Sequence, residues 1–185
     1  MKKKYGVIDS TLREGEQTPG VKISDHARRN ILSRLYKIGV DEIEMGIASP
    51  LNSHIPGLVD AARHITGGDC RLALWSRCVR RDISFAGSCK PDVLSLSIPA
   101  SDLHITKRLR RDRVWVLRKL SSSIAQAVRC DIPYISVGFE DSSRADPEFL
   151  VQLGKVAEES GARRIRLADT VGVCTPASIG RLVRG

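Results

Sequence analysis

The run Ile8-Asp-Ser-Thr-Leu-Arg-Glu-Gly-Glu-Gln17 passes from an apolar segment into a charged one. We expect Tyr5–Asp9 to be a buried strand and Thr11–Gly20 to be a polar loop. A dinucleotide-binding sheet would carry a G-x-G-x-x-G turn directly after its first strand. Ser10-Thr-Leu-Arg-Glu-Gly occupies that place instead, so the sequence argues against such a turn.

Short β-rich runs and longer helical runs alternate through the rest of the chain. Regular βα alternation indicates a parallel sheet with helical crossovers, here in about six βα units. Helices are predicted to begin near residues 24, 58, 80, 106, 146 and 176. Further strands are predicted at Glu42–Met45, Arg71–Trp75, Val93–Ile98, Ile132–Val137 and Arg164–Ala168.

Several helix boundaries are marked by residues with known capping roles. Ser24 is a favourable N-cap, and apolar residues follow it at helical spacing as far as Ile38. Gly39 is expected to end this helix. Asp146-Pro147 is typical of a helix start, because proline suits the first helical position.

Two architectures agree with this pattern. A doubly wound sheet is complete with about six strands, whereas a (β/α)₈ barrel typically needs about 250 residues. The length of 185 residues favours the doubly wound sheet, and the missing glycine-rich turn disfavours it. The pattern of strands and helices alone leaves both architectures open.

Charged side chains gather just after the predicted strands, as the active face of a barrel enzyme requires. Glu44 lies inside the apolar run Ile43-Glu44-Met45, where a buried carboxylate needs a charged partner. Arg13 is the natural partner, and Glu14 follows it directly. The sequence therefore predicts an ion pair between Arg13 and Glu44 at one mouth of the fold.

The composition is ordinary for a globular protein, with 42% hydrophobic and 28% charged residues. No apolar run is long enough to span a membrane or to form a signal-peptide core, so we expect a cytoplasmic protein without a membrane partner.

The five cysteines are scattered, which argues against a disulfide framework. No C-x-x-C, H-x-H or H-E-x-x-H spacing is present, which argues against a zinc site built from this chain alone.

Four runs resemble, in the same order, a family that includes 2-isopropylmalate synthase, homocitrate synthase and hydroxymethylglutaryl-CoA lyase. The runs are Ile8–Gln17, Ile43-Glu-Met-Gly46, Val137-Gly-Phe-Glu-Asp-Ser-Ser-Arg-Ala-Asp146 and Leu167-Ala-Asp-Thr-Val-Gly172. The last two are most similar to the branch of the family found in nitrogen-fixing bacteria. The family fold is a (β/α)₈ TIM barrel, so the resemblance implies that residues 1–185 form a partial catalytic TIM-barrel domain of the α/β class.

The resemblance also implies a reaction. It is a Claisen-type condensation of acetyl-CoA with 2-oxoglutarate that gives homocitrate and CoA for nitrogenase cofactor synthesis. Arg13 is the implied catalytic residue that stabilises negative charge on the keto oxygen, and Glu44 orients it. Glu14 is the implied ligand of a divalent metal ion, Mg, Mn or Zn, which acts as a Lewis acid. The implied substrate-binding residues are Gln17, Arg77, Ser136 and Thr170.

The match to the family has gaps. The family takes two further metal ligands from an H-x-H motif on its seventh strand, which this sequence does not contain. We therefore expect the 185-residue chain alone to be a poor enzyme. Lysine-pathway members carry a His and an Arg for 2-oxoglutarate where this chain has Val79 and Ser136, although Arg77, Arg80 or Arg81 can supply the charge.

Other functions stay open on the sequence. One alternative is a related acyltransferase that uses 2-oxoisovalerate or pyruvate, namely a 2-isopropylmalate or citramalate synthase, or a lyase. Another is an inactive fragment that serves as an interaction module.

The net charge is +9, and the segment with the most positive residues, Lys107–Arg113, is expected to be a solvated helix face or a contact for CoA phosphates. Nucleic acid is not an expected partner, because that segment lacks interleaved aromatic residues. A homodimer is implied for the full-length protein.

Overall fold

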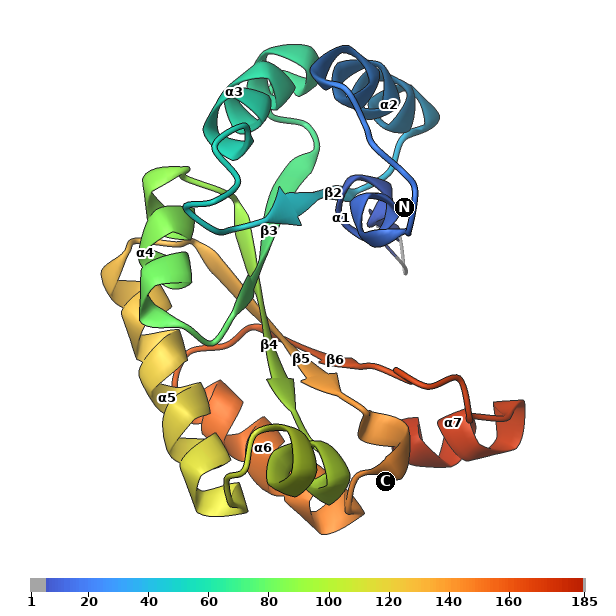
Figure 1. Cartoon of the computed structure of the whole chain (residues 1–185), viewed down its shortest axis with the longest axis vertical. Coiled ribbons are helices and arrows are strands. Elements are labelled where there is room, and N and C mark those ends of the chain that lie inside the picture. The colour runs from blue at the N-terminus through green and yellow to red at the C-terminus, as the bar shows by residue number, and fades with distance from the viewer. Residues whose placement is uncertain (1–5, 185) are drawn as a thin grey trace, which may run out of the picture.

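The structure is a computed structural model, and it describes residues 6–184. Its six parallel strands lie side by side in chain order, each paired with the next. A doubly wound sheet would reverse its strand order at a switch point, whereas a barrel adds each strand beside the last. The sheet curls into part of a (β/α)₈ barrel (Figure 1), as the family resemblance implied.

Strands and helices alternate along the described chain. The strands are β1 (Ile8–Asp9), β2 (Glu42–Ile47), β3 (Arg71–Arg77), β4 (Val93–Pro99), β5 (Tyr134–Glu140) and β6 (Arg164–Leu167). The α-helices are α1 (Thr11–Glu14), α2 (Asp25–Ile38), α3 (Ile55–Thr66), α4 (Arg80–Ser88), α5 (Arg113–Arg129), α6 (Pro147–Glu159) and α7 (Pro176–Arg184). Short 3₁₀ turns cover Gly15–Gln17 and Ser142–Arg144, and a π-helical turn covers His104–Arg108.

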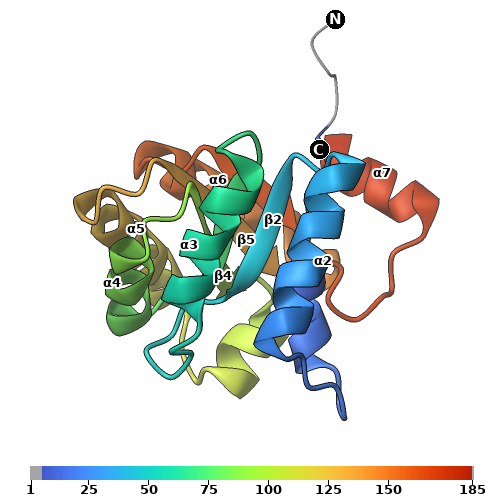
Figure 2. The ribbon, with the colours of Figure 1, turned by 90° about the horizontal axis from the view of Figure 1, so that it is seen from above.

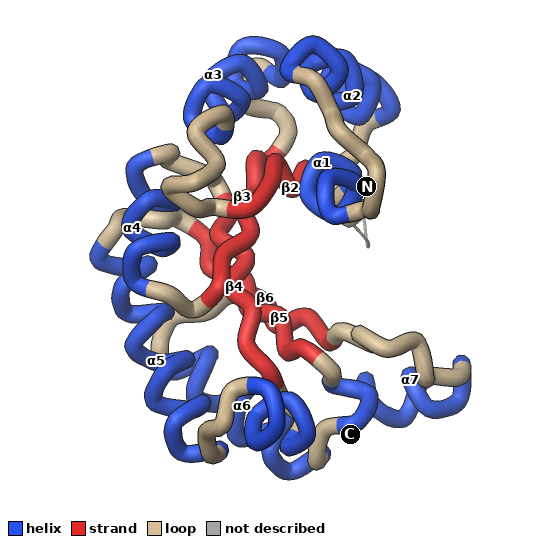
Figure 3. The backbone as a smooth tube through the Cα atoms, viewed as in Figure 1, coloured by secondary structure: helices blue, strands red, loops and turns tan. Residues whose placement is uncertain are grey.

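The hydrophobic core lies between the sheet and the surrounding helices. The strands line the concave side and the helices form the outer layer (Figure 3), and in the view from above β2 is seen between α3 and α2 (Figure 2). Successive strand residues point to opposite faces, so Ile43, Leu72 and Leu94 pack into the core under the helices. The alternate residues face the concave side, which is polar here and includes the buried Glu42 and Glu44.

The predicted helix ends are confirmed. Ser24 accepts a hydrogen bond from the Ala27 N–H at 3.2 Å, and Gly39 ends α2 in the left-handed conformation with φ 79°. Asp146 accepts from the Glu148 N–H at 3.0 Å at the start of α6. None of the helices within residues 6–184 is long and apolar enough to cross a membrane.

Three local predictions were wrong or incomplete. Ile8 is 37% exposed rather than buried, because β1 pairs only with β2 among the described strands, and Tyr5 lies outside the described residues. Thr11–Gly20 is not a plain loop, because α1 and the following 3₁₀ turn fill most of it. Ile38 does not share the buried face of α2, since it is the last helical residue and is 75% exposed.

Candidate active site

Helix α1 places Arg13 over the concave face of the sheet. The carboxylate of Asp9, at the end of β1, accepts hydrogen bonds from the Thr11 N–H at 2.9 Å and from its hydroxyl at 3.1 Å, which fixes the start of the helix. Leu12 is 1% exposed and anchors α1 in the core. Because Leu12 is held in the core, the next two side chains, Arg13 and Glu14, are directed toward the end of the sheet.

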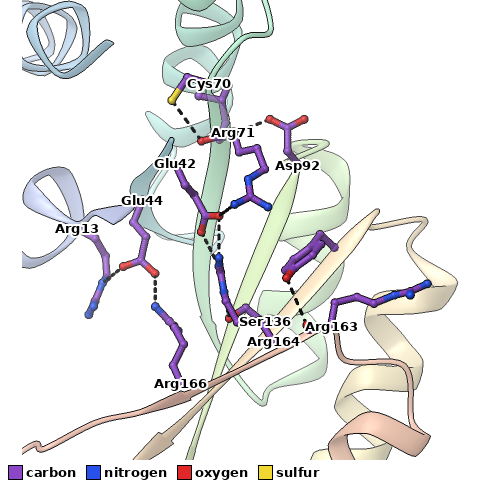
Figure 4. Close-up of polar contacts among 12 residues, drawn as sticks. Arg13, Glu42, Glu44, Cys70, Arg71, Asp92, Ser136, Arg163, Arg164 and Arg166 are labelled. Atoms are coloured by element: carbon purple, nitrogen blue, oxygen red, sulfur yellow. Dashed lines mark hydrogen bonds and ion pairs between the residues drawn. The ribbon is translucent and has the colours of Figure 1, made fainter. Parts of the chain in front are cut away.

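Two arginines, Arg13 of α1 and Arg166 of β6, hold the Glu44 carboxylate (Figure 4). Arg13 Nε donates to Glu44 Oε2 at 2.9 Å, and Arg166 Nη1 donates to Glu44 Oε1 at 2.8 Å. The Glu44 side chain is only 1% exposed. A carboxylate buried this deeply is stable only when it is paired and hydrogen-bonded, and both of its oxygens are engaged here. The expected Arg13–Glu44 ion pair is therefore present, with Arg166 as a second partner that the sequence analysis did not propose.

A second set of ion pairs lies two residues earlier on the same strands. Arg164 donates to the two carboxylate oxygens of Glu42 at 2.6 and 3.0 Å, and Arg71 approaches Glu42 at 3.3 Å. The third donor of Arg164, Nε, binds the Ser136 hydroxyl at 3.0 Å. Glu42 and Ser136 are buried in this lower layer and Arg71 is partly exposed, and none of these residues lines the cavity described next.

A cavity of about 520 Å³ lies above these ion pairs, at the carboxyl ends of the strands. Barrel enzymes place their active sites at this end of the sheet, because loops from successive strands converge there. Its walls come from α1, from the ends of β3 to β6 and from the residues just after β6. The lining residues are Arg13, Glu14, Trp75, Ser97, Gly138, Glu140, Arg166, Leu167, Ala168, Asp169 and Thr170. A larger apolar groove of about 630 Å³ lies between α6 and α7, away from the Arg13–Glu44 pair.

Thr170 and Glu14 bring two further functional groups to the cavity. The Thr170 hydroxyl oxygen accepts a hydrogen bond from the Asp141 N–H at 2.8 Å, which leaves its proton free to donate to an anion. The Glu14 side chain is 54% exposed and pairs with Arg13 Nη2. Three of the residues singled out from the sequence, Arg13, Glu14 and Thr170, thus line one cavity, with Glu44 behind Arg13.

The loop that carries Thr170 is held by a buried acid. Asp141 accepts two hydrogen bonds from the Arg144 guanidinium, at 2.7 and 2.8 Å, and one from the Ser101 hydroxyl at 2.5 Å. The Arg144 guanidinium, with help from Ser101, holds the pKa of the Asp141 carboxyl below its usual value. Asp141 is therefore a charged anchor rather than a proton donor, and its backbone N–H fixes the position of Thr170.

The residues implied to hold a metal do not form a complete site in the described part of the chain. No group of three or more His, Cys, Asp or Glu side chains is arranged to bind a cation within residues 6–184. Glu14 is a single exposed carboxylate engaged with Arg13, and one such ligand is too few for a divalent ion.

Three of the implied substrate-binding residues do not reach the cavity. Gln17 is exposed in the 3₁₀ turn that leads away from α1. Arg77 turns to Asp82 at the start of α4, with hydrogen bonds of 2.7 and 3.0 Å. Ser136 is fully buried in the lower layer, where Arg164 occupies its hydroxyl.

Two of the cavity residues that were not singled out from the sequence contact the Arg13–Glu44 pair. Arg166 contacts Glu44, and the Trp75 ring lies under the Arg13 guanidinium with Arg13 Cζ 5.5 Å from its centroid. The available signal for Arg166 was the spacing Arg164-Ile165-Arg166, which places two cations on one face of a predicted strand. Two acids, Glu42 and Glu44, have the same spacing on another strand.

The chain is similar to known proteins along nearly its whole length. The sequence model of the HMGL-like family matches residues 4–185. The homocitrate synthase of Frankia alni is 40% identical over 184 residues, covering 95% of this chain and 50% of that protein. The homocitrate synthase subunit alpha of Clostridium pasteurianum is 36% identical over 170 residues, covering 92% of this chain and 62% of that protein. This chain thus spans about half the length of the curated relatives it matches.

A solved structure shows the same fold. The HMG-CoA lyase of Bacillus subtilis superposes with a TM-score of 0.79 over 98% of this chain and 64% of that chain. Its sequence is 20% identical, so this likeness supports the partial barrel and not an activity. The match along the sequence, together with the curled parallel sheet, shows that the chain belongs to the HMGL-like family.

Proposed function

We propose that this chain forms part of the active site of an acyltransferase that condenses acetyl-CoA with a 2-oxo acid. The observation that carries the proposal is the position of Arg13, held by the buried Glu44 at the wall of a cavity that Thr170 also lines. The proposed substrate is 2-oxoglutarate and the proposed products are homocitrate and CoA. The identity to two homocitrate synthases supports this choice.

The side chains divide the proposed reaction between them. The Thr170 hydroxyl donates to the carboxylate next to the keto group, and Arg13 faces the keto oxygen. The acetyl methyl group loses one proton to a base, its carbon then forms a bond to the keto carbon of the 2-oxo acid, and the π electron pair of the keto C=O bond moves to the oxygen. The keto oxygen becomes negative, is stabilised by Arg13 and is then protonated. Water cleaves the thioester, which releases CoA and leaves a new carboxylate.

Glu44 acts through Arg13 rather than on the substrate. Its carboxylate takes Arg13 Nε and Arg166 Nη1, so neither guanidinium is free to rotate. A donor that is already oriented costs little reorganisation when charge develops on the keto oxygen. We propose Glu44 as the positioning residue of the site.

Glu14 is proposed as one ligand of a divalent metal ion, Mg²⁺, Mn²⁺ or Zn²⁺. The support is the resemblance of the Ile8–Gln17 run to the family motif and the exposure of the Glu14 carboxylate at the cavity. The same resemblance supports a role in supplying homocitrate for nitrogenase cofactor synthesis.

The proposed function is tested by measuring CoA release from acetyl-CoA with a thiol reagent. The purified protein is assayed with Mg²⁺, Mn²⁺ or Zn²⁺ and with 2-oxoglutarate, 2-oxoisovalerate or pyruvate in parallel. We expect release to depend on the 2-oxo acid and to be fastest with 2-oxoglutarate. Faster release with 2-oxoisovalerate or pyruvate would assign the protein to the related synthases instead. Release that is independent of any 2-oxo acid would contradict a condensing enzyme.

A further inference from the structure

Arg166 presents an edge of its guanidinium that no described residue uses. Its Nη1 donates to Glu44, whereas its Nε is buried without an acceptor. Nη2 has no hydrogen-bond partner among residues 6–184 either, since the one bond that Arg166 makes there is through Nη1. Nε and Nη2 lie on the same side of the guanidinium, and arginine grips a carboxylate with two such parallel N–H groups.

Arg164 shows that the free edge is not a general feature of this strand. Arg164 lies two residues earlier on β6 and faces the same side of the sheet. All three of its nitrogens are engaged, Nη1 and Nη2 with Glu42 and Nε with the Ser136 hydroxyl. In the upper layer the residue that corresponds to Ser136 is Gly138, which has no group to offer Arg166.

Gly138 leaves space beside the free edge of Arg166. A Cβ atom built on Gly138 would lie 3.5 Å from Arg166 Nη2 and 3.8 Å from its Nε. Both residues line the same cavity. The unused N–H groups therefore face a place in the cavity wall where the protein supplies no side chain.

The acidic residues of the cavity already have other partners. Glu14 pairs with Arg13, and Glu140 accepts from the Ser97 hydroxyl at 2.8 Å and lies 3.5 Å from Arg108. Asp169 accepts from the backbone N–H groups of Val173 at 3.1 Å and of Cys174 at 2.8 Å. None of these carboxylates is hydrogen-bonded to Arg166 in the described structure, so none of them occupies the Nε–Nη2 edge in place of a bound anion.

We infer that Arg166 binds the second carboxylate of a dicarboxylic 2-oxo acid. The inference rests on the proposed function, in which Thr170 takes the first carboxylate and Arg13 the keto oxygen, and it names the substrate class for that site. Pyruvate and 2-oxoisovalerate have one carboxylate only and leave the Nε–Nη2 edge unfilled. Arg166 thus determines specificity in place of Arg77 and Ser136, which lie outside the cavity.

Calorimetric binding of two matched ligands tests this assignment. 2-Oxoglutarate and 2-oxopentanoate have the same chain length and differ in the second carboxylate. We expect the wild-type protein to bind 2-oxoglutarate at least about tenfold more tightly, a difference typical of one charge-assisted contact. Arg166 also holds Glu44, so the measured quantity is the ratio of the two affinities: Arg166→Gln is expected to lose the preference for 2-oxoglutarate, and Arg166→Lys is expected to keep part of it. Arg163→Gln, which removes an exposed arginine just before β6, is the matched control.

A second variant tests the site without removing Arg166. Gly138→Asp places a carboxylate beside the free edge, so it is expected to abolish the preference for 2-oxoglutarate even if Arg166→Gln fails to fold. An equal loss of affinity for the two ligands in Arg166→Gln, or an unchanged preference in both variants, would contradict the carboxylate site at Arg166. Neither result would contradict the proposed function. A wild-type protein that binds neither 2-oxo acid would contradict the proposed function as well.

Discussion

Glu42 of β2 and Arg164 of β6 are joined by two hydrogen bonds of 2.6 and 3.0 Å, although 122 residues separate them in the sequence. Three strands lie between β2 and β6 in the sheet, so the contact forms only because the sheet curls. Glu44 and Arg166, each two residues further along the same two strands, form a second contact between β2 and β6 at the floor of the cavity. The curvature that makes a barrel and the geometry of the candidate active site therefore depend on the same charged side chains.

The first prediction concerns the energy of the lower ion pair. Glu42→Met or Arg164→Met alone leaves one charge without its main partner, and each is expected to lower the free energy of unfolding by about 3 kcal/mol. The double variant removes both charges and is expected to lose less than the sum, with a coupling of about 1–3 kcal/mol. Urea unfolding followed by far-UV circular dichroism measures all four proteins. Simple additivity would show that the contact does not hold the curled sheet together.

The second prediction concerns Gly46, where β2 shifts register against β3. Its φ is +146°, and an added Cβ would lie 2.6 Å from Ile55 Cδ1. Gly46→Ala is expected to destabilise the protein by about 1–3 kcal/mol, because a side chain strains this backbone conformation. Gly57→Ala in α3 is the control, since nothing lies within 4 Å of its Cβ position. It is expected to stabilise by about 0.5–1 kcal/mol, and a similar loss in both variants would contradict the explanation.

The third prediction concerns pH and the anchor of the Thr170 loop. The pKa of Asp141 is lowered in the folded protein, first by the Arg144 guanidinium and then by the Ser101 hydroxyl. Its carboxylate therefore stabilises the fold above the unfolded value of about 3.9 and loses this effect as the pH falls through the folded value. Asp141→Asn is expected to be less stable than wild type at about pH 7 and to approach it below about pH 4. The exposed Asp69→Asn is the control, and a difference that does not shrink in acid would argue against the linkage.

Features that depend on neighbouring residues could be predicted from the sequence, whereas contacts between distant strands could not. Ser24, Gly39 and the Asp146-Pro147 pair act on their own helices, so their roles follow from neighbouring residues. Arg13 and Glu44 were paired correctly because a carboxylate in an apolar run requires a cation nearby. Arg166 was missed because its contact with Glu44 depends on the curl of the sheet, which no local pattern specifies. Ser136, which was predicted to bind substrate, lies in the buried layer, and one step of two residues along β5 separates that layer from the cavity.

The fourth prediction concerns thiol reactivity. Burial raises the pKa of Cys78 to about 11, so only about one thiol in a thousand is ionised at about pH 8. Cys130 and Cys174 are half-buried. Iodoacetamide treatment of the folded protein, followed by peptide mass mapping, is expected to modify Cys130 and Cys174 well before Cys78. Equal labelling in the native protein would contradict the packing described between the sheet and its helices.

The fifth prediction addresses the central claim, that Arg13 is held by Glu44 to stabilise charge on the keto oxygen. The measurement is the kcat for CoA release from acetyl-CoA with 2-oxoglutarate, in wild type, Arg13→Gln and the control Arg163→Gln. Loss of one preorganised donor is expected to lower kcat about 10²–10³-fold in Arg13→Gln, with little change in Arg163→Gln. An Arg13→Gln protein that is folded and turns over at the wild-type rate would contradict the account.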